Sequence, residues 1–259
     1  MPELPDVEML RQYASDYALN QKIEGVKFFD ERMLRSGKQK ISKALKGNSF
    51  SESRRIGKYL LIKCNESWLV MHFGMTGSLK YFENGDNPPD YSQLVINFKN
   101  NHALAYISKR KLGSIEIEDD PEVFASKHEI GKDAMRISLK DFYKIMSNKK
   151  GSIKNALMDQ SSVSGIGNIY VDEILFQEKI HPKADIDNLD KNSLKSLYNT
   201  IKRIMRIAIR HQANPSDLPD RYLLSDRREG RECPACSGRI KIINVNGRST
   251  YICTKCQKE

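Results

Sequence analysis

Four cysteines near the end of the chain constrain its fold more than any other feature. They form two C-x2-C pairs separated by sixteen residues: Cys233 and Cys236, then Cys253 and Cys256. Two residues between thiolates allow both sulfurs to reach one tetrahedral ion, so the spacing predicts a zinc site. Four thiolates complete the coordination sphere, and the one expected Zn2+ is therefore structural. Disulfides are the alternative, less favoured in a chain without a secretion signal.

The residues between the cysteine pairs predict a β-hairpin. From Arg239 to Tyr251 apolar and polar residues alternate around Asn246-Gly247, a dipeptide typical of tight hairpin turns. This hairpin would hold three cations on a small rigid frame suited to phosphate contact: Arg239, Lys241 and Arg248. The fifth cysteine, Cys64, lies in a strand-like run and is predicted to be a small core residue.

The rest of the chain divides into a β-rich part and a helical part. Apolar residues at three- and four-residue steps predict a helix from Pro2 to Tyr17, with Pro2 and Pro5 in its first turn. From about residue 22 to 117, short β-rich runs predict an antiparallel sandwich or barrel. Beyond residue 130 the periodicity is helical, over Leu139–Met146, Ile153–Met158, Asn168–Phe176 and Leu194–His211. We therefore expect domains at 1–130, 131–228 and 229–259.

Charge and hydropathy indicate the partner and the compartment. The net charge is +10, with 19 Lys/Arg against 18 Asp/Glu in residues 1–131 and 24 against 15 in residues 132–259. Such asymmetry favours a polyanionic partner, although a merely well-solvated basic surface would carry the same charge. No apolar run approaches the ~20 residues of a membrane span. The start MPELPDVE does not resemble a signal peptide, so a cytoplasmic, nucleoid-associated protein is expected.

The first residues offer a candidate reactive group. Removal of Met1 would expose the ring nitrogen of Pro2 as a secondary amine beside the carboxylate of Glu3. A terminal amine titrates near ~8, so a useful fraction is unprotonated at neutral pH and can attack a sugar carbon to form an iminium ion. Proline and glutamate are also ordinary first-turn residues, and these two alone leave that structural interpretation open.

Five segments occur in an order that resembles the formamidopyrimidine-DNA glycosylase and endonuclease VIII family. They are PELPDVE at the start, IGKYL at 56–60, HFGMTG at 72–77, SGIGNIY at 164–170, and the four cysteines. The resemblance spans the whole chain and implies an α+β multidomain fold: an N-terminal helix and antiparallel β-sandwich, then a helix–two-turn–helix domain with a C-terminal zinc finger. Such enzymes grip damaged double-stranded DNA between the two domains, and a monomer suits the family.

The resemblance also implies the roles of a bifunctional DNA glycosylase and abasic-site lyase. Pro2 matches the nucleophile at C1′ of the damaged nucleoside, and Glu3 matches the acid/base at the deoxyribose. Lys58 matches a lysine that assists β-elimination, and Arg248 an arginine implicated in δ-elimination. The enzyme is expected to excise oxidised or ring-opened bases through a Schiff base, with no cofactor beyond structural zinc.

Further residues are implied to contact DNA. Asn168 matches a contact to the phosphates that flank the lesion, and Lys150 and Lys154 are expected on the DNA face. Free backbone N–H groups at the helix opened by Gly165–Asn168 are expected to hold a DNA phosphate. The gap left by a flipped nucleotide must be filled, and the matching trio is Met75, Arg110 and Leu112.

Two departures from the family pattern bear on specificity. The segment SKRKLG at 108–113 stands where Asp-Pro-Arg-Arg-Phe-Gly is usual, and residues 214–233 lack a long Gly/Ser/Thr-rich loop that closes over oxidised guanine in many members. Lesion and opposite-base preference therefore do not carry over. The departures motivate an alternative, a non-catalytic paralogue that binds damaged or structured DNA. A zinc-ribbon partner of RNA or the ribosome would leave the Pro2-Glu3 start unexplained.

Overall fold

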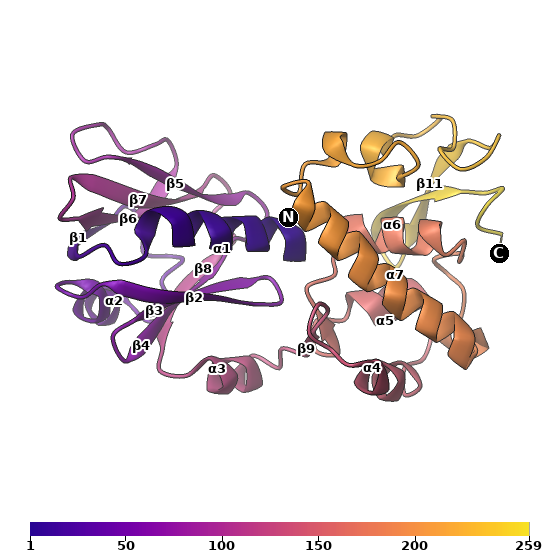
Figure 1. Ribbon diagram of the computed structural model, residues 1–259, viewed down its shortest axis with the longest axis horizontal. Helices are drawn as coiled ribbons and strands as arrows, with labels where there is room; N and C mark the ends of the chain where they lie inside the picture. The colour runs from indigo at the N-terminus through magenta and orange to yellow at the C-terminus, as the bar shows by residue number, and fades with distance from the viewer. Residues whose placement is uncertain (259) are drawn as a thin grey trace. The chain divides into compact units, whose positions relative to one another are not determined.

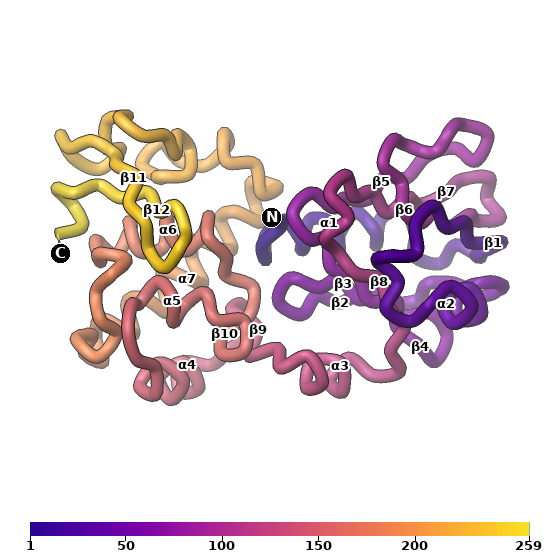
Figure 2. The backbone as a smooth tube through the Cα atoms, turned by 180° about the vertical axis from the view of Figure 1, so that it is seen from behind, coloured from indigo at the N-terminus to yellow at the C-terminus, as the bar shows by residue number. Residues whose placement is uncertain are grey.

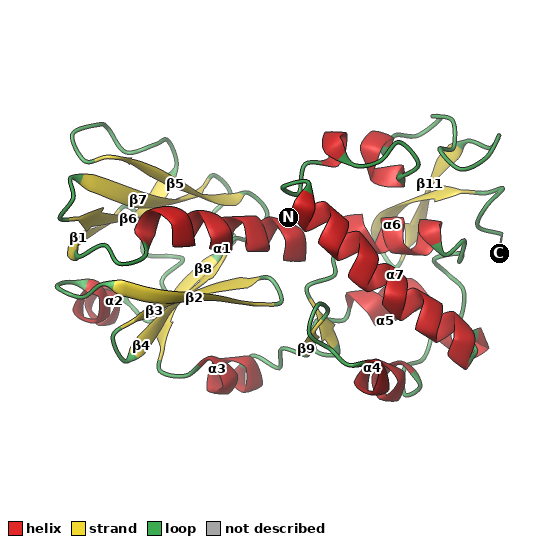
Figure 3. Cartoon of the chain, in the orientation of Figure 1, coloured by secondary structure: helices red, strands yellow, loops and turns green. Residues whose placement is uncertain are grey.

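The computed structural model describes residues 1–258, and these form two compact units. Unit 1 comprises residues 1–2 and 6–128, and unit 2 comprises Glu3–Pro5 and the chain from Glu129 onward. Unit 1 consists mainly of strands and unit 2 mainly of helices (Figure 3). Because the helical part and the cysteine-rich part group together in unit 2, the division expected at residue 228 stays a prediction.

Unit 1 is an antiparallel β-sandwich. Its two four-stranded sheets have the strand orders β1-β6-β7-β5 and β2-β3-β4-β8 (Figure 1). Leu60 and Leu69 from one sheet share a core with Leu94 and Leu104 from the other, so the sheets face each other and the sandwich is confirmed over a barrel. The elements are α1 (Leu4–Ala18), β1 (Ile23–Phe28), α2 (Lys38–Leu45), β2 (Phe50–Ile56), β3 (Tyr59–Cys64), β4 (Ser67–His72), β5 (Gly77–Glu83), β6 (Ser92–Phe98), β7 (His102–Ser108), β8 (Ser114–Glu118) and α3 (Pro121–Lys127).

Helix α1 begins two residues later than its periodicity suggests. It starts at Leu4, so Pro5 lies in the first turn as expected but Pro2 precedes the helix. Val7 and Ala14 pack into the sandwich core, whereas Leu4 belongs to the core of unit 2. The chain therefore leaves Pro2 outside regular structure, where a proline nitrogen has no helical hydrogen bond to lose.

Unit 2 is built on helices that the sequence periodicity located closely. Helices α4 and α5 match the predicted bounds, while α7 begins three residues early because the Asp190 side chain accepts a hydrogen bond from the Ser193 N–H and caps it. Among the described residues no helix has the length and apolar character to cross a membrane. The elements are β9 (Lys132–Asp133), α4 (Leu139–Met146), α5 (Ile153–Met158), β10 (Val163–Ser164), α6 (Asn168–Gln177), η1 (Ile186–Asn188), α7 (Lys191–Arg210), η2 (Pro215–Asp217), η3 (Leu223–Asp226), β11 (Ile240–Val245) and β12 (Arg248–Cys253).

The predicted hairpin near the C-terminus is confirmed. Strands β11 and β12 pair antiparallel, with Val245 opposite Arg248. The two turn residues Asn246 and Gly247 have φ angles of 49° and 77°. Positive φ at both central residues defines the type I′ turn that an Asn-Gly dipeptide favours. The hairpin lies beside α6 in Figure 2.

A buried acid on α6 makes the stability of unit 2 dependent on pH. Glu173 is fully buried, and burial raises its pKa to about 7, although its oxygens accept hydrogen bonds from the Gln177 amide (2.7 Å) and the Leu224 N–H (2.8 Å). The usual pKa of a glutamate carboxyl is 4.5, and folding raises that of Glu173. Such a group stabilises the folded state fully below pH 4.5, and this stabilisation is lost as the pH rises through about 7.

We therefore expect the unfolding free energy of the wild type to fall between pH 5 and pH 8 by roughly 2 to 3 kcal/mol relative to Glu173→Gln. Denaturant unfolding followed by helical circular dichroism at several pH values measures this difference. Glu129→Gln, at an exposed glutamate of the same unit, is the control and should follow the wild type. Parallel pH profiles for wild type and Glu173→Gln would contradict the expectation.

Candidate active site and zinc centre

The carboxylate of Glu3 is anchored to the N-terminus of α6. The residue is 2% exposed, and its two oxygens accept hydrogen bonds from the backbone N–H groups of Gly167 (2.8 Å), Ile169 (2.8 Å) and Tyr170 (3.2 Å). These are the orphan donors of the helix, at the positive end of its dipole. A carboxylate of the chain therefore takes three of the donors at this helix start, and these three are not available to the DNA phosphate that was expected there.

Glycine is required where this anchor forms. A Cβ atom on Gly167 would lie 2.3 Å from the carboxyl carbon of Glu3, far inside van der Waals contact. The Leu4 N–H also donates to the Gly165 carbonyl oxygen at 3.0 Å. The SGIGNIY segment thus has a structural purpose that its motif did not reveal, since it holds Glu3 and the residue that follows. Pro2, half-buried, is covalently joined to this anchored residue.

Lys58 lies at the tip of the hairpin between β2 and β3. Ile56 pairs with Tyr59, so Gly57 and Lys58 form a two-residue turn, with Gly57 at φ 55°. The Arg55 guanidinium donates to the Gly57 carbonyl oxygen (2.9 Å) and to the Glu8 carboxylate on α1 (3.1 Å). This pair of hydrogen bonds ties the turn that carries Lys58 to α1. Neither Arg55 nor Glu8 was singled out from the sequence, although each lies in or beside a family-like segment.

His72, at the end of β4, is a further candidate that the sequence did not assign a role. Burial, with the nearby positive charge of Lys58, lowers the pKa of His72 to about 4. Its Nδ1 atom accepts a hydrogen bond from the Gly74 N–H at 3.3 Å. The imidazole is therefore neutral at physiological pH and carries its proton on Nε2, where it can act as a hydrogen-bond donor. The HFGMTG segment contained this residue, but only its proximity to Lys58 marks it.

The three predicted gap-filling residues come together on two neighbouring loops of unit 1. Met75 and Leu112 are 44% and 53% exposed, and Arg110 is exposed as well. The Arg110 N–H donates to the Thr76 hydroxyl at 3.3 Å. Gly74 has φ 56°, and a Cβ there would lie 2.5 Å from the Leu112 carbonyl carbon, so the loop backbones are in direct contact. Two large exposed apolar side chains next to an arginine form a surface against which the bases of DNA could pack.

Three other residues predicted to contact DNA, Lys150, Arg248 and Asn168, lie on α6, at the start of β12 or on a loop before α5. Lys150 is exposed and forms an ion pair with Asp187 at 2.7 Å. Arg248 is exposed at the start of β12. Asn168 begins α6, and its amide donates to the Ser249 carbonyl oxygen at 3.1 Å.

Lys154 does not lie on a DNA-facing surface, and that prediction is wrong. Its side chain is 0% exposed, and its ammonium group bonds to the Asp172 carboxylate at 2.7 Å and to the Thr250 hydroxyl at 2.6 Å. Burial lowers the pKa of Lys154, and the Asp172 charge opposes this effect. A lysine enclosed in this way cannot reach a phosphate in this structure.

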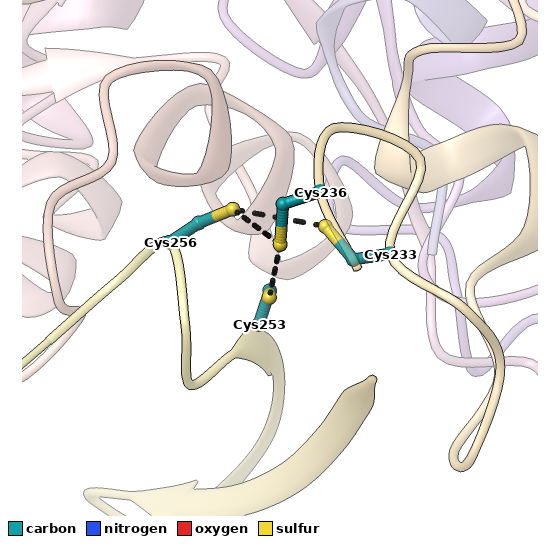
Figure 4. Close-up of side chains that lie close together, drawn as sticks. All are labelled: Cys233, Cys236, Cys253 and Cys256. Carbon is teal, nitrogen blue, oxygen red and sulfur yellow. Dashed lines mark hydrogen bonds between the residues drawn. The ribbon is translucent and has the colours of Figure 1, made fainter. Parts of the chain in front are cut away.

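The four C-terminal cysteines converge on one point (Figure 4). Their sulfur atoms all lie within 4.8 Å of one another, with the shorter separations between 3.3 and 3.7 Å. A tetrahedron with Zn–S bonds of about 2.3 Å has edges of about 3.8 Å, so the site fits one zinc ion. The separations far exceed an S–S bond of about 2.05 Å, which removes the disulfide alternative. Cys64 is buried in unit 1, and burial raises its pKa to about 11, as suits a core residue.

Family comparisons cover nearly all of the chain. Residues 1–115 match the formamidopyrimidine-DNA glycosylase N-terminal domain, 130–219 the H2TH domain of the same glycosylase, and 230–258 a zinc finger found in FPG and IleRS. A formamidopyrimidine-DNA glycosylase of Streptococcus pyogenes is 33% identical over 275 residues, which cover 100% of this chain and 99% of that protein. The chain belongs to the formamidopyrimidine-DNA glycosylase family.

Solved structures of the formamidopyrimidine-DNA glycosylase family agree with this assignment. Lactococcus lactis Fpg in complex with DNA containing an abasic site superposes with a TM-score of 0.90 at 29% identity, covering 99% of this chain and 100% of that one. The same protein in complex with DNA containing FAPY-dG gives a TM-score of 0.90 at 28% identity, with the same coverage. Membership makes the chain a base excision repair glycosylase with one structural zinc, and it confirms the predicted fold class, including the helix–two-turn–helix domain.

Proposed function

We propose that this glycosylase excises oxidised or ring-opened bases from double-stranded DNA and then cleaves the abasic strand by β,δ-elimination, with Pro2 as the covalent nucleophile. The observation that carries the proposal is the anchoring of Glu3 on α6. A carboxylate held by three backbone donors next to Pro2 gives the N-terminal amine a defined acidic neighbour. The DNAs bound in two complexes of Lactococcus lactis Fpg, one with an abasic site and one with FAPY-dG, support the substrate class.

The chemistry requires Met1 to be removed so that the Pro2 nitrogen becomes a secondary amine. Its lone pair attacks C1′, the bond from C1′ to the base breaks, and the base leaves with a proton. When the C1′–O4′ bond opens and O4′ takes a proton, the product is an iminium ion, because the tertiary nitrogen has no proton left to lose. The positive charge forms beside the Glu3 carboxylate, which stabilises it, and Glu3 is the proposed acid/base for O4′.

The iminium ion acidifies the neighbouring sugar carbon and allows strand cleavage. Loss of the C2′ proton expels the 3′ phosphate, which is the β-elimination, and loss of the C4′ proton then expels the 5′ phosphate. We propose that Lys58 assists the first elimination and Arg248 the second, since a cation stabilises the departing phosphate. Arg55, by bonding the Gly57 carbonyl oxygen, would hold the Lys58 turn in place.

The loops of unit 1 support the DNA part of the proposal. Met75, Arg110 and Leu112 are exposed and adjacent, which a filler of the vacated base stack requires. Leucine stacks less well than an aromatic ring but still fills space. That the protein acts as a monomer in the cytoplasm at the nucleoid stays a prediction.

Borohydride trapping tests the proposal. The untagged protein is mixed with a duplex containing an abasic site, reduced, digested and analysed by mass spectrometry. We expect an adduct on the peptide that begins with Pro2. A protein that binds this duplex but gives no adduct would favour the non-catalytic paralogue. An adduct on a lysine peptide alone would overturn the assignment of Pro2 but leave lyase chemistry in place.

Substitution of Glu3 separates its structural role from its chemical role. We expect Glu3→Ala to lower the unfolding free energy of unit 2 by roughly 2 to 4 kcal/mol, because three buried N–H groups lose their acceptor. Glu3→Gln keeps an acceptor oxygen and should destabilise less. Both should slow base release by a factor on the order of 10² or more, since neither offers a carboxylate.

Denaturant unfolding and single-turnover base release measure the two effects. Glu129→Gln is the control for both measurements. If Glu3→Gln released base at the wild-type rate, Glu3 would be a helix cap and nothing more.

A further inference from the structure

A buried charge cluster joins α5, α6 and β12 within unit 2. The ammonium group of Lys154 on α5 and the carboxylate of Asp172 on α6 are 2.7 Å apart, and both side chains are 0% exposed. Removing two charges from water costs several kcal/mol per ion, and their mutual attraction offsets this cost only when further hydrogen bonds satisfy both groups. The further hydrogen-bond partners of Lys154 and Asp172 therefore show which parts of unit 2 this ion pair holds together.

Both oxygens of Asp172 are engaged, and one reaches the zinc hairpin. Oδ1 takes the Lys154 bond, while Oδ2 accepts from the Arg227 guanidinium at 2.5 Å and from the Tyr251 backbone N–H at 3.1 Å. The Arg227 guanidinium also lies 4.1 Å from the centre of the Tyr251 ring, in cation–π contact. Asp172 thus binds the backbone of β12 directly and orients a second side chain that covers it.

Lys154 extends the connection toward Arg248. Its second hydrogen bond goes to the Thr250 hydroxyl at 2.6 Å, and that hydroxyl donates to the Arg248 carbonyl oxygen at 3.1 Å. Thr250 is fully buried, so no water competes for these bonds. An uninterrupted chain of hydrogen bonds therefore runs from Asp172 through Lys154 and Thr250 to the backbone of Arg248.

A second contact from the same face of α6 strengthens the docking. Asn168 and Asp172 are four residues apart, so their side chains lie on one side of the helix. Asn168 donates to the Ser249 carbonyl oxygen at 3.1 Å, and Asp172 accepts from the Tyr251 N–H. One helix face therefore holds β12 at two places, and Figure 2 shows the strand beside α6.

Zinc alone does not determine where Arg248 lies. Only Cys253, at the far end of β12, is a zinc ligand in this strand, and five steps of about 3.4 Å along the strand place it roughly 17 Å from Arg248. A two-stranded hairpin is marginally stable by itself and can twist over such a length. The contacts from α6 act on the residues next to Arg248, where zinc does not.

We propose that Asp172 is a positioning residue that fixes the Arg248 end of the zinc hairpin on α6, through Tyr251 and through Lys154 and Thr250. The inference rests on the proposed role of Arg248 in δ-elimination. Lys154 and Arg227 contribute two positive charges against the single negative charge of Asp172, and Arg248 adds a third. This excess favours an incoming phosphate at the same end of the hairpin.

Two variants test the proposal at different points of the chain of bonds. Thr250→Val removes only the link from Lys154 to the Arg248 carbonyl and keeps the side-chain shape and charge. Asp172→Asn weakens the whole cluster. For both we expect borohydride adduct formation within about twofold of wild type, unchanged zinc content, and a tenfold or greater shift of strand products from β,δ toward β. Asp187→Asn, which breaks the exposed pair with Lys150, is the matched control and should keep the wild-type ratio.

Hydrogen exchange gives a readout that does not depend on activity. We expect the amides of residues 248–251 to exchange at least tenfold faster in both variants, while those of residues 240–245 change less. A wild-type product ratio in both variants would overturn the inference, and so would wild-type exchange at the Tyr251 amide. If the wild-type protein itself cleaves no strand, the proposed function fails, and the exchange result alone still decides whether Asp172 positions the hairpin.

Discussion

Protein that retains Met1, or that carries one extra residue before Pro2, is expected to cleave an abasic duplex on the order of 10³-fold or more slowly than processed protein. The extra residue converts the Pro2 nitrogen into an amide, whose lone pair is delocalised into a carbonyl and cannot attack C1′. Affinity for the duplex should be unchanged, because no side chain is altered. Single-turnover cleavage assays and binding titrations on the same preparations measure the two quantities.

Pro2→Gly provides a graded control for this experiment. Glycine keeps a terminal amine, so a covalent adduct can still form, but a primary amine gives an imine that loses its proton and withdraws electrons less strongly. We expect cleavage between that of the processed and the blocked protein. Equal cleavage by blocked and processed protein would show that another nucleophile performs the reaction.

Loss of the zinc ion is expected to lower δ-elimination at least 100-fold and to leave unit 1 folded. Zinc binding contributes about 10 kcal/mol or more to the folding of isolated zinc fingers, so Cys253→Ser should unfold much of the hairpin that carries Arg248. Trp68 is the single tryptophan, and it is buried in β4 of unit 1. Its fluorescence therefore reports on unit 1 while cleavage assays and metal analysis report on the hairpin.

Cys64→Ala is the matched control for the zinc experiment. Cys64 is buried in the sandwich core and lies outside the zinc cluster, so this variant should keep one zinc ion and strand cleavage. It should instead lower the stability of unit 1, because a buried sulfur is removed. Formation of the δ-elimination product by Cys253→Ser at the wild-type rate would mean that the hairpin does not take part in that step.

Local patterns predicted the elements of this protein well. Helices α4 and α5 follow from apolar spacing, and the Asn246-Gly247 turn follows from a dipeptide that favours positive φ at both residues. The zinc site follows from the thiolate spacing. The extra turn of α7 was missed because the Asp190 cap lies before the first apolar residue of the periodic pattern.

Long-range pairing was beyond these patterns. The SGIGNIY segment indicated an anion at a helix N-terminus, which is correct, but the anion is Glu3, more than 160 residues earlier in the chain. Lys154 follows two lysines and a glycine and looks like a solvated residue, yet its partners are Asp172 and, 96 residues away, Thr250. The periodicity of apolar residues predicts which face of a helix or strand is buried. It does not predict which distant polar group will pair with a charged residue on that element.

The helices, the strands, the zinc ligands and the family resemblance can all be read from the amino-acid sequence, because each depends on residues close together or on motifs in a recognisable order. Three further features follow only from the folded chain: Glu3 caps α6, Arg55 holds the Lys58 turn, and Lys154 is an internal anchor of the hairpin. These are pairings of polar groups removed from water, and a buried polar group is stable only with its specific partner. That partner is supplied by the packing of distant elements, which no local pattern encodes.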